Sequence, residues 1–171
     1  MKGFTQIYTG NGKGKTTAAL GLVVRAIGAG LRVYFGQFLK DGKASEMRTL
    51  KKRFPDVTVE TFGSGCFVRC EPTPEEVAAA RAGLDRIRSA LTGGRYDVVI
   101  ADEINVAVSL GMLGVPEIRA LVMDKPAGVE LVLTGRNADR RLYKFADLVT
   151  EARSIKHYYS RGVRARKGIE K

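Results

Sequence analysis

The chain contains no tryptophan, one histidine and two cysteines among its 171 residues. A structural zinc site needs about four ligands, most of them Cys or His. Cys66, Cys70 and His157 do not complete such a set. We therefore interpret the two cysteines as reduced thiols in a loop or at its edge, the usual state of cysteine inside the cell.

Long apolar runs are also missing. No stretch approaches the ~18 apolar residues that a membrane-spanning helix needs, and residues 1–4 lead directly into a strand-like segment. A signal peptide would have a basic region, an apolar stretch and a small-residue cleavage site. We expect a cytoplasmic protein without a membrane partner.

Acidic residues are few, since 18 Asp and Glu stand against 29 Lys and Arg and give a net charge of +11. This charge favours polyanionic partners, such as nucleic acids, nucleoside triphosphates or other anionic metabolites. Residues 161–171 hold five of the basic residues and one acidic residue. A solvated end of the chain explains this cluster as well as a polyanion contact does.

The apolar pattern predicts a single α/β domain over residues 1–171. Apolar runs alternate with stretches of helical periodicity, which is typical of βαβ units and a mainly parallel sheet flanked by helices. The expected strands are residues 4–9, 32–38, 57–62, 98–101, 129–133 and 148–151. The expected helices are residues 15–29, 73–91, 103–110, 116–122 and 139–145, with a short helix inside residues 39–53.

A glycine-rich loop stands between the first strand and the first helix. Its residues are Gly10, Asn11, Gly12, Lys13, Gly14, Lys15, Thr16 and Thr17. Glycines let several backbone amides converge on an anion, and the helix N-terminus adds free N–H groups and partial positive charge. In this pattern Lys15 contacts phosphate oxygens and the Thr16 hydroxyl coordinates Mg²⁺. The sequence therefore predicts a nucleoside triphosphate site.

The spacing of this loop departs from the common pattern G-x-x-x-x-G-K-[ST]. Counted back from Gly14, the first glycine of the pattern falls on Thr9, and Gly10 comes one residue later. A glycine-rich turn without a ligand is the alternative. The order of strand, loop, lysine, threonine and helix favours the phosphate site.

Charged residues follow the two apolar runs at residues 98–101 and 129–133. Ligands of open α/β sheets bind outside the carboxyl ends of the strands, so Asp102 or Glu103 is suited to hold the Mg²⁺ of a nucleotide. A cap on the following helix is the alternative for one of the two. Arg136 follows the next apolar run, where a guanidinium suits phosphate or ribose. A surface arginine without a ligand is the alternative there.

Together these segments resemble the ATP:corrinoid adenosyltransferases of the cobalamin pathway, in order and along nearly the whole chain. The matching runs are residues 8–19, 37–40, 102–104, 133–136, 146–151, 156–157, 162–165 and 168–170. The displaced first glycine is itself a trait of that family. The resemblance implies an α/β fold that is P-loop NTPase-like and RecA-like, with a mainly parallel sheet flanked by helices.

The resemblance implies transfer of an alkyl group and not of phosphate. The cobalt of a reduced Co(I) corrinoid attacks the 5′ carbon of ATP, and inorganic triphosphate leaves from a reversed position in the loop. Amides, Lys15, Mg²⁺ and Arg136 would stabilise the growing charge of this leaving group. The substrate supplies the nucleophile, which agrees with the lack of a Ser/His/Asp or Cys/His constellation.

Site residues carry over by motif position. Thr16 and Glu103 would bind Mg²⁺, or Mn²⁺ in its place, with Asp102 as the nearby alternative. Arg136 would reach the ribose–phosphate region, and Arg25 matches a family arginine near the nucleotide, with a solvated helix arginine as its alternative. The phosphates would be held by Gly10, Asn11, Gly12, Lys13, Gly14, Lys15, Thr16 and Thr17.

The resemblance implies that the corrinoid is bound by a loop after the third strand. The family uses aromatic residues there to shield the cobalt and displace its lower ligand, and Phe67 fits that role, with plain packing as its alternative. Some members carry a tryptophan nearby, which this chain lacks. Lys15, Arg136 and Phe67 are thus the predicted catalytic residues. The family also suggests a homodimer, a flavoprotein reductant and no nucleic-acid partner.

Two other classes of protein share part of the pattern. A generic P-loop ATPase or small-molecule kinase would need a water-positioning residue or a phosphate-acceptor site, and no motif points to one. A nucleic-acid-binding ATPase would agree with the charge of +11. Such proteins usually carry basic patches with stacking aromatics or a groove-fitting helix, and here only Tyr158 and Tyr159 accompany the basic run.

Overall fold

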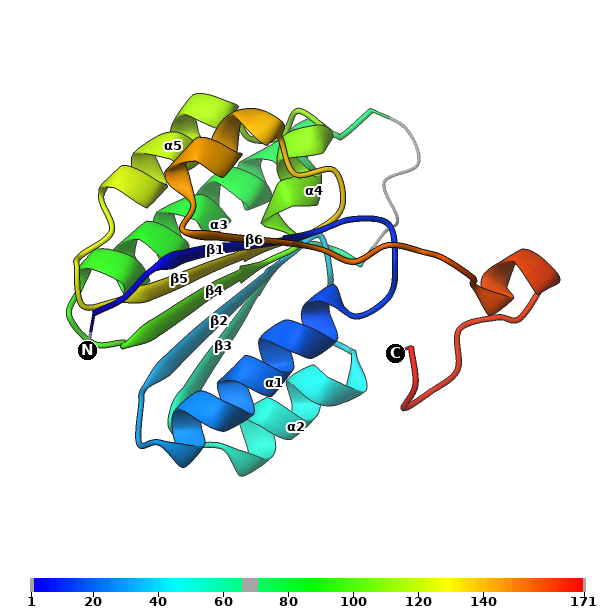
Figure 1. Ribbon diagram of the computed structural model, residues 1–171, viewed down its shortest axis with the longest axis horizontal. Coiled ribbons are helices and arrows are strands. Elements are labelled where there is room, and N and C mark those ends of the chain that lie inside the picture. Colours follow the sequence, from blue (N-terminus) through cyan, green and yellow to red (C-terminus); the bar gives the residue numbers. More distant parts are fainter. Residues whose placement is uncertain (1, 66–70, 171) are drawn as a thin grey trace.

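Six parallel strands form the sheet of the computed structural model, which describes residues 2–65 and 71–170 (Figure 1). The strands are β1 (Thr5–Thr9), β2 (Val33–Phe38), β3 (Val57–Phe62), β4 (Val98–Asp102), β5 (Glu130–Thr134) and β6 (Leu148–Glu151). Their order is β3-β2-β4-β5-β1-β6, and each pair of neighbours runs parallel. The predicted α/β class is confirmed. Phe67, Cys66 and Cys70 lie outside the described residues.

Helices cover both faces of the sheet (Figure 1). One face carries α1 (Lys15–Gly28) and α2 (Ser45–Arg53), and the other carries α3 (Pro74–Thr92), α4 (Ile104–Ser109), α5 (Val115–Met123) and the 3₁₀ helix η1 (Arg140–Phe145). Each layer buries its own cluster of apolar side chains against the sheet. Crossover connections between parallel strands place helices on both faces in this way.

The two apolar runs that precede the charged residues form the central strands. Every residue of β4 is buried, and so are four of the five residues of β5. Across the sheet, Gln37 pairs with Asp102 and Tyr8 pairs with Thr134. The carboxyl ends of β1, β2, β4 and β5 therefore meet at one edge of the sheet, as the sequence predicts.

Local sequence signals account for the helix boundaries. The α3 helix begins at Pro74, one residue after the predicted start, and Thr73 and Glu76 form a capping box by exchanging hydrogen bonds. The predicted helix at 103–110 begins one residue later, because Glu103 adopts a left-handed φ of 61°. The strands predicted at 57–62 and 148–151 have those bounds.

Beyond β6, the C-terminal segment (residues 152–170) leaves the sheet. The β6 strand is an exposed edge strand. The C-terminal segment then runs past the loop between β1 and α1 and contains the 3₁₀ turn η2 (Tyr158–Arg161), drawn orange to red in Figure 1. Among the described residues, no helix combines the length and apolarity needed to cross a bilayer.

Candidate active site

The predicted phosphate loop joins β1 to α1 at the carboxyl edge of the sheet. Gly14 has a φ of 121° and stands directly before α1. The next residue, Lys15, is only 8% exposed, and its Nζ donates a hydrogen bond to the Gly12 carbonyl at 2.7 Å. A helix N-terminus with free N–H groups next to a buried ammonium group is suited to bind an anion.

Several charges surround the Lys15 ammonium. Burial lowers the pKa of Lys15, and the nearby Arg136 guanidinium lowers it further. The carboxylates of Glu103 and Asp102 raise the same pKa, and Lys40 adds a weaker lowering effect. Arg136 and Lys40 thus lie close enough to repel the Lys15 ammonium, and an anion in the loop would relieve that repulsion.

The position of the first glycine of the loop, at residue 10 and not residue 9, has a steric cause. Gly10 has a φ of 97°, and a Cβ placed on it would lie 2.3 Å from the carbonyl oxygen of Ala152. A Cβ on Gly12 would lie 2.8 Å from the same oxygen. Thr9 instead has room for its side chain, which accepts a hydrogen bond from the Ala138 N–H at 3.1 Å. The loop needs glycine where the C-terminal segment passes, and position 9 does not.

Asp102 is the most enclosed carboxylate of the site, with no exposed surface. Its Oδ1 accepts hydrogen bonds from the Thr16 hydroxyl at 2.9 Å and the Thr134 hydroxyl at 2.6 Å. Its Oδ2 accepts one from Gln37 Nε2 at 2.8 Å. These three donors are uncharged, so they orient Asp102 without cancelling its negative charge.

Glu103 lies beside Asp102 in strained backbone, since a left-handed φ of 61° is uncommon outside glycine. Its N–H donates to the Thr134 hydroxyl at 3.1 Å, and its Oε1 lies 3.6 Å from Lys40 Nζ. Burial, and then the charge of Asp102, raises the pKa of the Glu103 carboxyl, while Lys40 opposes the rise. A cation near Glu103 would therefore be favoured.

The donor set at this edge suits a hard divalent cation. Thr16 and Asp102 are in direct contact, and Glu103 is the next residue on the same strand end. Within residues 2–65 and 71–170, no three His, Cys, Asp or Glu side chains converge to form a metal-binding group. Mg²⁺ fits such a site, because it keeps several waters and takes one or two carboxylates together with substrate phosphates.

Two of the three donors to Asp102, Gln37 and Thr134, are not among the site residues that the sequence predicts. Gln37 lies near the end of β2 and Thr134 at the end of β5, the two strands that flank β4. Gln37 is fully buried, and its Oε1 has no hydrogen-bond partner in the described structure. A buried polar residue at the end of a strand was the available signal, but its partner depends on the strand order.

The predicted arginines occupy different places. Arg136 is exposed just after β5, and its charge acts on both Lys15 and Glu103. Arg25 lies in the last turn of α1, ten residues beyond Lys15 and therefore about 15 Å along the helix. Burial, and then the charge of Glu130, raises the pKa of Tyr8, and the charge of Arg25 opposes that rise. Arg136 thus belongs to the cluster around the loop, and Arg25 does not.

Two cavities open near the carboxyl edge. One of about 260 Å³ lies beside the phosphate loop, between α1 and β6; its lining includes Tyr8, Thr9, Gly14, Lys15, Leu148 and Thr150. Another of about 340 Å³ lies between the end of β3 and the start of α3; its lining includes Leu39, Phe62, Gly63, Thr73 and Glu76. The carboxyl edge of the sheet therefore has room for further ligand groups beside a triphosphate bound in the loop.

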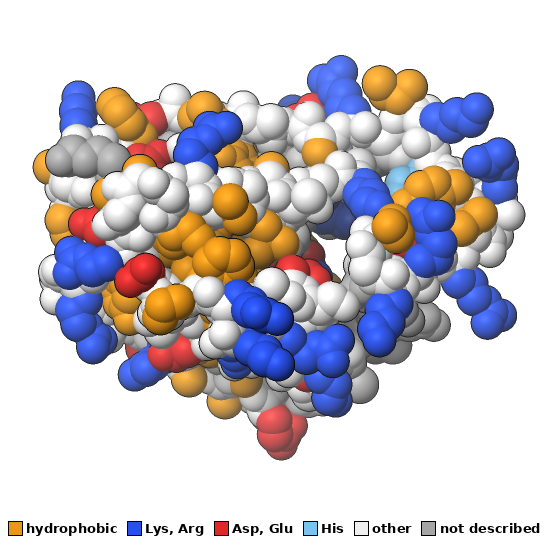
Figure 2. All heavy atoms as spheres, turned by 90° about the horizontal axis from the view of Figure 1, so that it is seen from below, with side chains coloured by type: hydrophobic (Ala, Val, Ile, Leu, Met, Phe, Trp, Pro, Cys, Tyr) orange, Lys and Arg blue, Asp and Glu red, His pale blue; other side chains and the backbone are white. Residues whose placement is uncertain are grey.

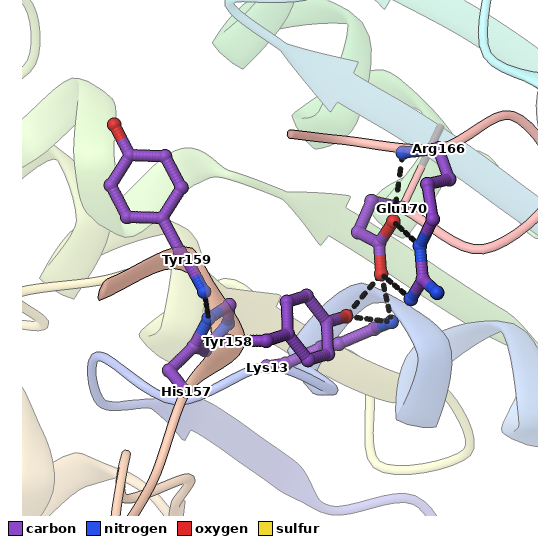
Figure 3. Close-up of polar contacts among 6 residues, drawn as sticks. All are labelled: Lys13, His157, Tyr158, Tyr159, Arg166 and Glu170. Atoms are coloured by element: carbon purple, nitrogen blue, oxygen red, sulfur yellow. Dashed lines mark hydrogen bonds and ion pairs between the residues drawn. The ribbon is translucent and has the colours of Figure 1, made fainter. Parts of the chain in front are cut away.

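The remaining loop side chains face solvent or the C-terminal segment. Thr17 is exposed in the first turn of α1. The Asn11 side-chain oxygen accepts a hydrogen bond from the Ser154 N–H at 3.1 Å, and Lys13 contacts Glu170 (Figure 3). In Figure 2, a hollow separates the body of the domain from the C-terminal segment, which the pale blue histidine marks, and Lys and Arg side chains stand around it.

Comparison with known proteins gives one consistent result. A family model described as "ATP:corrinoid adenosyltransferase BtuR/CobO/CobP" matches residues 1–170. The chain is 32% identical to a corrinoid adenosyltransferase of Pseudomonas aeruginosa over 170 residues, which cover 99% of this chain and 84% of the relative. It is 37% identical to one from a Sinorhizobium species, over 99% of this chain and 80% of the relative. It is 31% identical to one from Escherichia coli, over 99% and 86%.

Proposed function

This chain belongs to the ATP:corrinoid adenosyltransferase family, and from that premise we propose that it transfers the 5′-deoxyadenosyl group of ATP to the Co(I) of a reduced corrinoid. The bond between C5′ and its oxygen breaks and a cobalt–carbon bond forms. The electron pair of the broken bond leaves with inorganic triphosphate. Cobalt supplies the two electrons of the new bond, so no side chain has to act as a base.

The observation that carries this proposal is the enclosed, cationic phosphate loop. Lys15 is almost fully buried and already donates to a loop carbonyl, so its ammonium is held in place before any ligand arrives. The charge of Arg136 acts on the same ammonium. Donors that are fixed in advance stabilise charge that grows in the transition state at little reorganisation cost. Triphosphate is the leaving group that this arrangement suits.

A divalent cation would occupy the place between the loop and the end of β4. We propose that Thr16 and Asp102 or Glu103 hold Mg²⁺, or Mn²⁺ in its place, with Asp102 fixing the Thr16 hydroxyl. When bound, the cation would neutralise part of the triphosphate charge. Hydrogen bonds from Gln37 and Thr134 fix the orientation of the Asp102 carboxylate.

Finer assignments rest on the family relation. We propose that the chain acts as a single-domain subunit of a cytoplasmic homodimer, with Co(I) supplied by a flavoprotein reductant, in adenosylcobalamin synthesis or salvage. Phe67 stays the candidate that shields the cobalt. Arg25 stays a candidate for the nucleoside end, supported by its influence on Tyr8 beside the 260 Å³ cavity.

An anaerobic assay tests the proposal. The protein is mixed with ATP, Mg²⁺ and chemically reduced cobalamin, and the corrinoid spectrum and the phosphate products are followed together. We expect a cobalt–carbon bond and one triphosphate for each adenosyl group transferred. Release of ADP and phosphate without alkylation of the corrinoid would contradict the proposal and favour an ordinary P-loop ATPase.

A further inference from the structure

The phosphate loop and the C-terminal segment are built against each other. The Gly12 N–H donates to the Ala152 carbonyl at 2.7 Å, and the Ala152 N–H donates to the Thr9 carbonyl at 2.8 Å. The Ser154 N–H donates to the Asn11 side chain. The leading half of the loop therefore has the C-terminal segment as one of its walls.

Lys13 extends this contact with its side chain. Its Nζ lies 3.0 Å from Glu170 Oε1 and 3.1 Å from the Tyr158 hydroxyl. Dashed lines mark both contacts in Figure 3. The ammonium also lies 5.8 Å from the centre of the Tyr158 ring. A loop residue expected to meet phosphate is thus bound to the far end of the chain.

The Glu170 carboxylate is held in place without help from Lys13. It accepts hydrogen bonds from the Arg166 N–H at 2.8 Å, from Arg166 Nε at 3.2 Å and from Arg166 Nη2 at 3.0 Å. The Tyr158 hydroxyl donates to it as well. Arg166, followed by Tyr158, holds the pKa of Glu170 far below its usual range. Lys13 can therefore leave Glu170 without stranding a negative charge.

The Lys13 contact is the weak link of this cluster. The Lys13 side chain is 42% exposed, whereas that of Glu170 is 15% exposed. Exposed ion pairs contribute little to stability, and the lysine side chain is a flexible stem with a compact charge. A triphosphate carries several negative charges against one on Glu170, so it competes strongly for the ammonium.

We propose that Lys13 exchanges partners: Glu170 and Tyr158 hold it until a triphosphate enters the loop, and the triphosphate then takes it and loosens residues 157–170. Glu170 is then a positioning residue that acts through Lys13. This inference rests on the proposed function, because the triphosphate is the product left in the loop. It links occupancy of the loop to the attachment of the C-terminal segment.

Hydrogen exchange of the whole protein tests the loosening. The amides of Gly162, Val163, Ile169 and Glu170 bond to carbonyls within residues 158–166. We expect inorganic triphosphate with Mg²⁺ to speed their exchange about threefold or more. In Lys13→Met, exchange should be fast without ligand and should not respond to triphosphate. Slower or unchanged exchange in the wild type at saturation would overturn the inference.

Calorimetric binding of triphosphate tests the competition. Glu170→Gln should tighten binding about two- to fivefold, because an exposed ion pair of ordinary strength no longer competes. In the Lys13→Met background the same change should have no effect. Glu60→Gln is the matched control, since Glu60 also accepts two hydrogen bonds from an arginine, Arg86, far from the loop; its affinity should equal that of the wild type.

The outcomes separate this inference from the proposed function. Weaker triphosphate binding in Glu170→Gln, or an equal effect in the Lys13→Met background, would show that Glu170 acts only on the fold and would overturn the inference alone. A wild-type protein that binds no triphosphate at all would overturn the proposed function and the inference together. Unchanged affinity in Glu170→Gln would also overturn the inference alone, because a merely structural Glu170 would loosen the segment without competing for Lys13.

Discussion

Two carboxylates face the phosphate loop from opposite sides, and they are held in opposite ways. Asp102 is fully buried and accepts from two hydroxyls and an amide, all uncharged. Glu170 lies nearer the surface and accepts from Arg166 and Lys13, which are cations. Uncharged donors orient a carboxylate and leave its charge available to a ligand, whereas cationic donors cancel that charge. Asp102 can therefore serve a metal ion, whereas Glu170 attaches the C-terminal segment to the phosphate loop.

The largest expected effect separates the lysines on the two sides. Lys15→Ala should lower turnover by about 10²- to 10³-fold, because a buried donor to the leaving group is lost. Lys13→Met should lower it by no more than about tenfold, since its charge is partly exposed and screened. Steady-state rates at saturating ATP and corrinoid measure both. Equal losses would remove the distinction between the two sides.

The carboxylates themselves give the next contrast. Asp102→Asn should raise the Mg²⁺ concentration needed for half-maximal activity by about 10- to 100-fold, because it disturbs the orientation and charge around the proposed ligand Thr16. Glu170→Gln should leave the Mg²⁺ requirement unchanged. Activity titrated with Mg²⁺ at fixed ATP decides. A shared shift would mean that both carboxylates act on the cation.

The close contact between the phosphate loop and the C-terminal segment leads to the next prediction, a smaller effect that concerns stability. Gly10→Ala should lower the free energy of unfolding by about 1–3 kcal/mol, because an alanine would be strained at a φ of 97° and would meet the Ala152 carbonyl. Gly21→Ala is the matched control, since nothing lies near a Cβ in that turn of α1; it should raise stability by about 0.5–1 kcal/mol. Urea unfolding measures both, and a neutral Gly10→Ala would mean that the segment yields easily.

The smallest expected effect concerns acid. The folded-state pKa of Glu170 is depressed, so its contribution is fully present above the pKa of an unfolded glutamate, about 4.3, and is lost only as the pH falls through the lower folded value. Hydrogen exchange in residues 157–170, corrected for the intrinsic effect of pH, should therefore be equally slow at pH 7 and pH 5. Loss of protection already at pH 5 would contradict the tight hold of Arg166 on Glu170.

The sequence predicts the part of the site around Lys15, Asp102 and Arg136, because that part depends on local pattern. The apolar runs before Asp102 and Arg136 mark central strands, and the loop before Lys15 marks a helix start. Strand ends of a parallel sheet share an edge, so these residues are expected together. No such rule selects Gln37 and Thr134 as donors to Asp102, because that needs β4 to lie between β2 and β5.

The contacts between the phosphate loop and the C-terminal segment could not be predicted from local pattern. Lys13 and Glu170 are separated by 157 residues, and a basic tail is equally compatible with a solvated end. The structure instead ties Glu170 to Arg166 and Tyr158 beside the loop. The need for glycine at position 10 has the same origin, since the obstructing Ala152 carbonyl belongs to a distant part of the chain.

The contact between Lys13 and Glu170 also has a consequence for biosynthesis. The loop leaves the ribosome well over a hundred residues before the residues that contact it, from Ala152 to Glu170. Contacts of such long sequence separation form late in folding. A nascent chain can therefore present glycines, Lys15 and Thr16 long before it has a finished nucleotide site, so binding competence waits until residues 152–170 have been made.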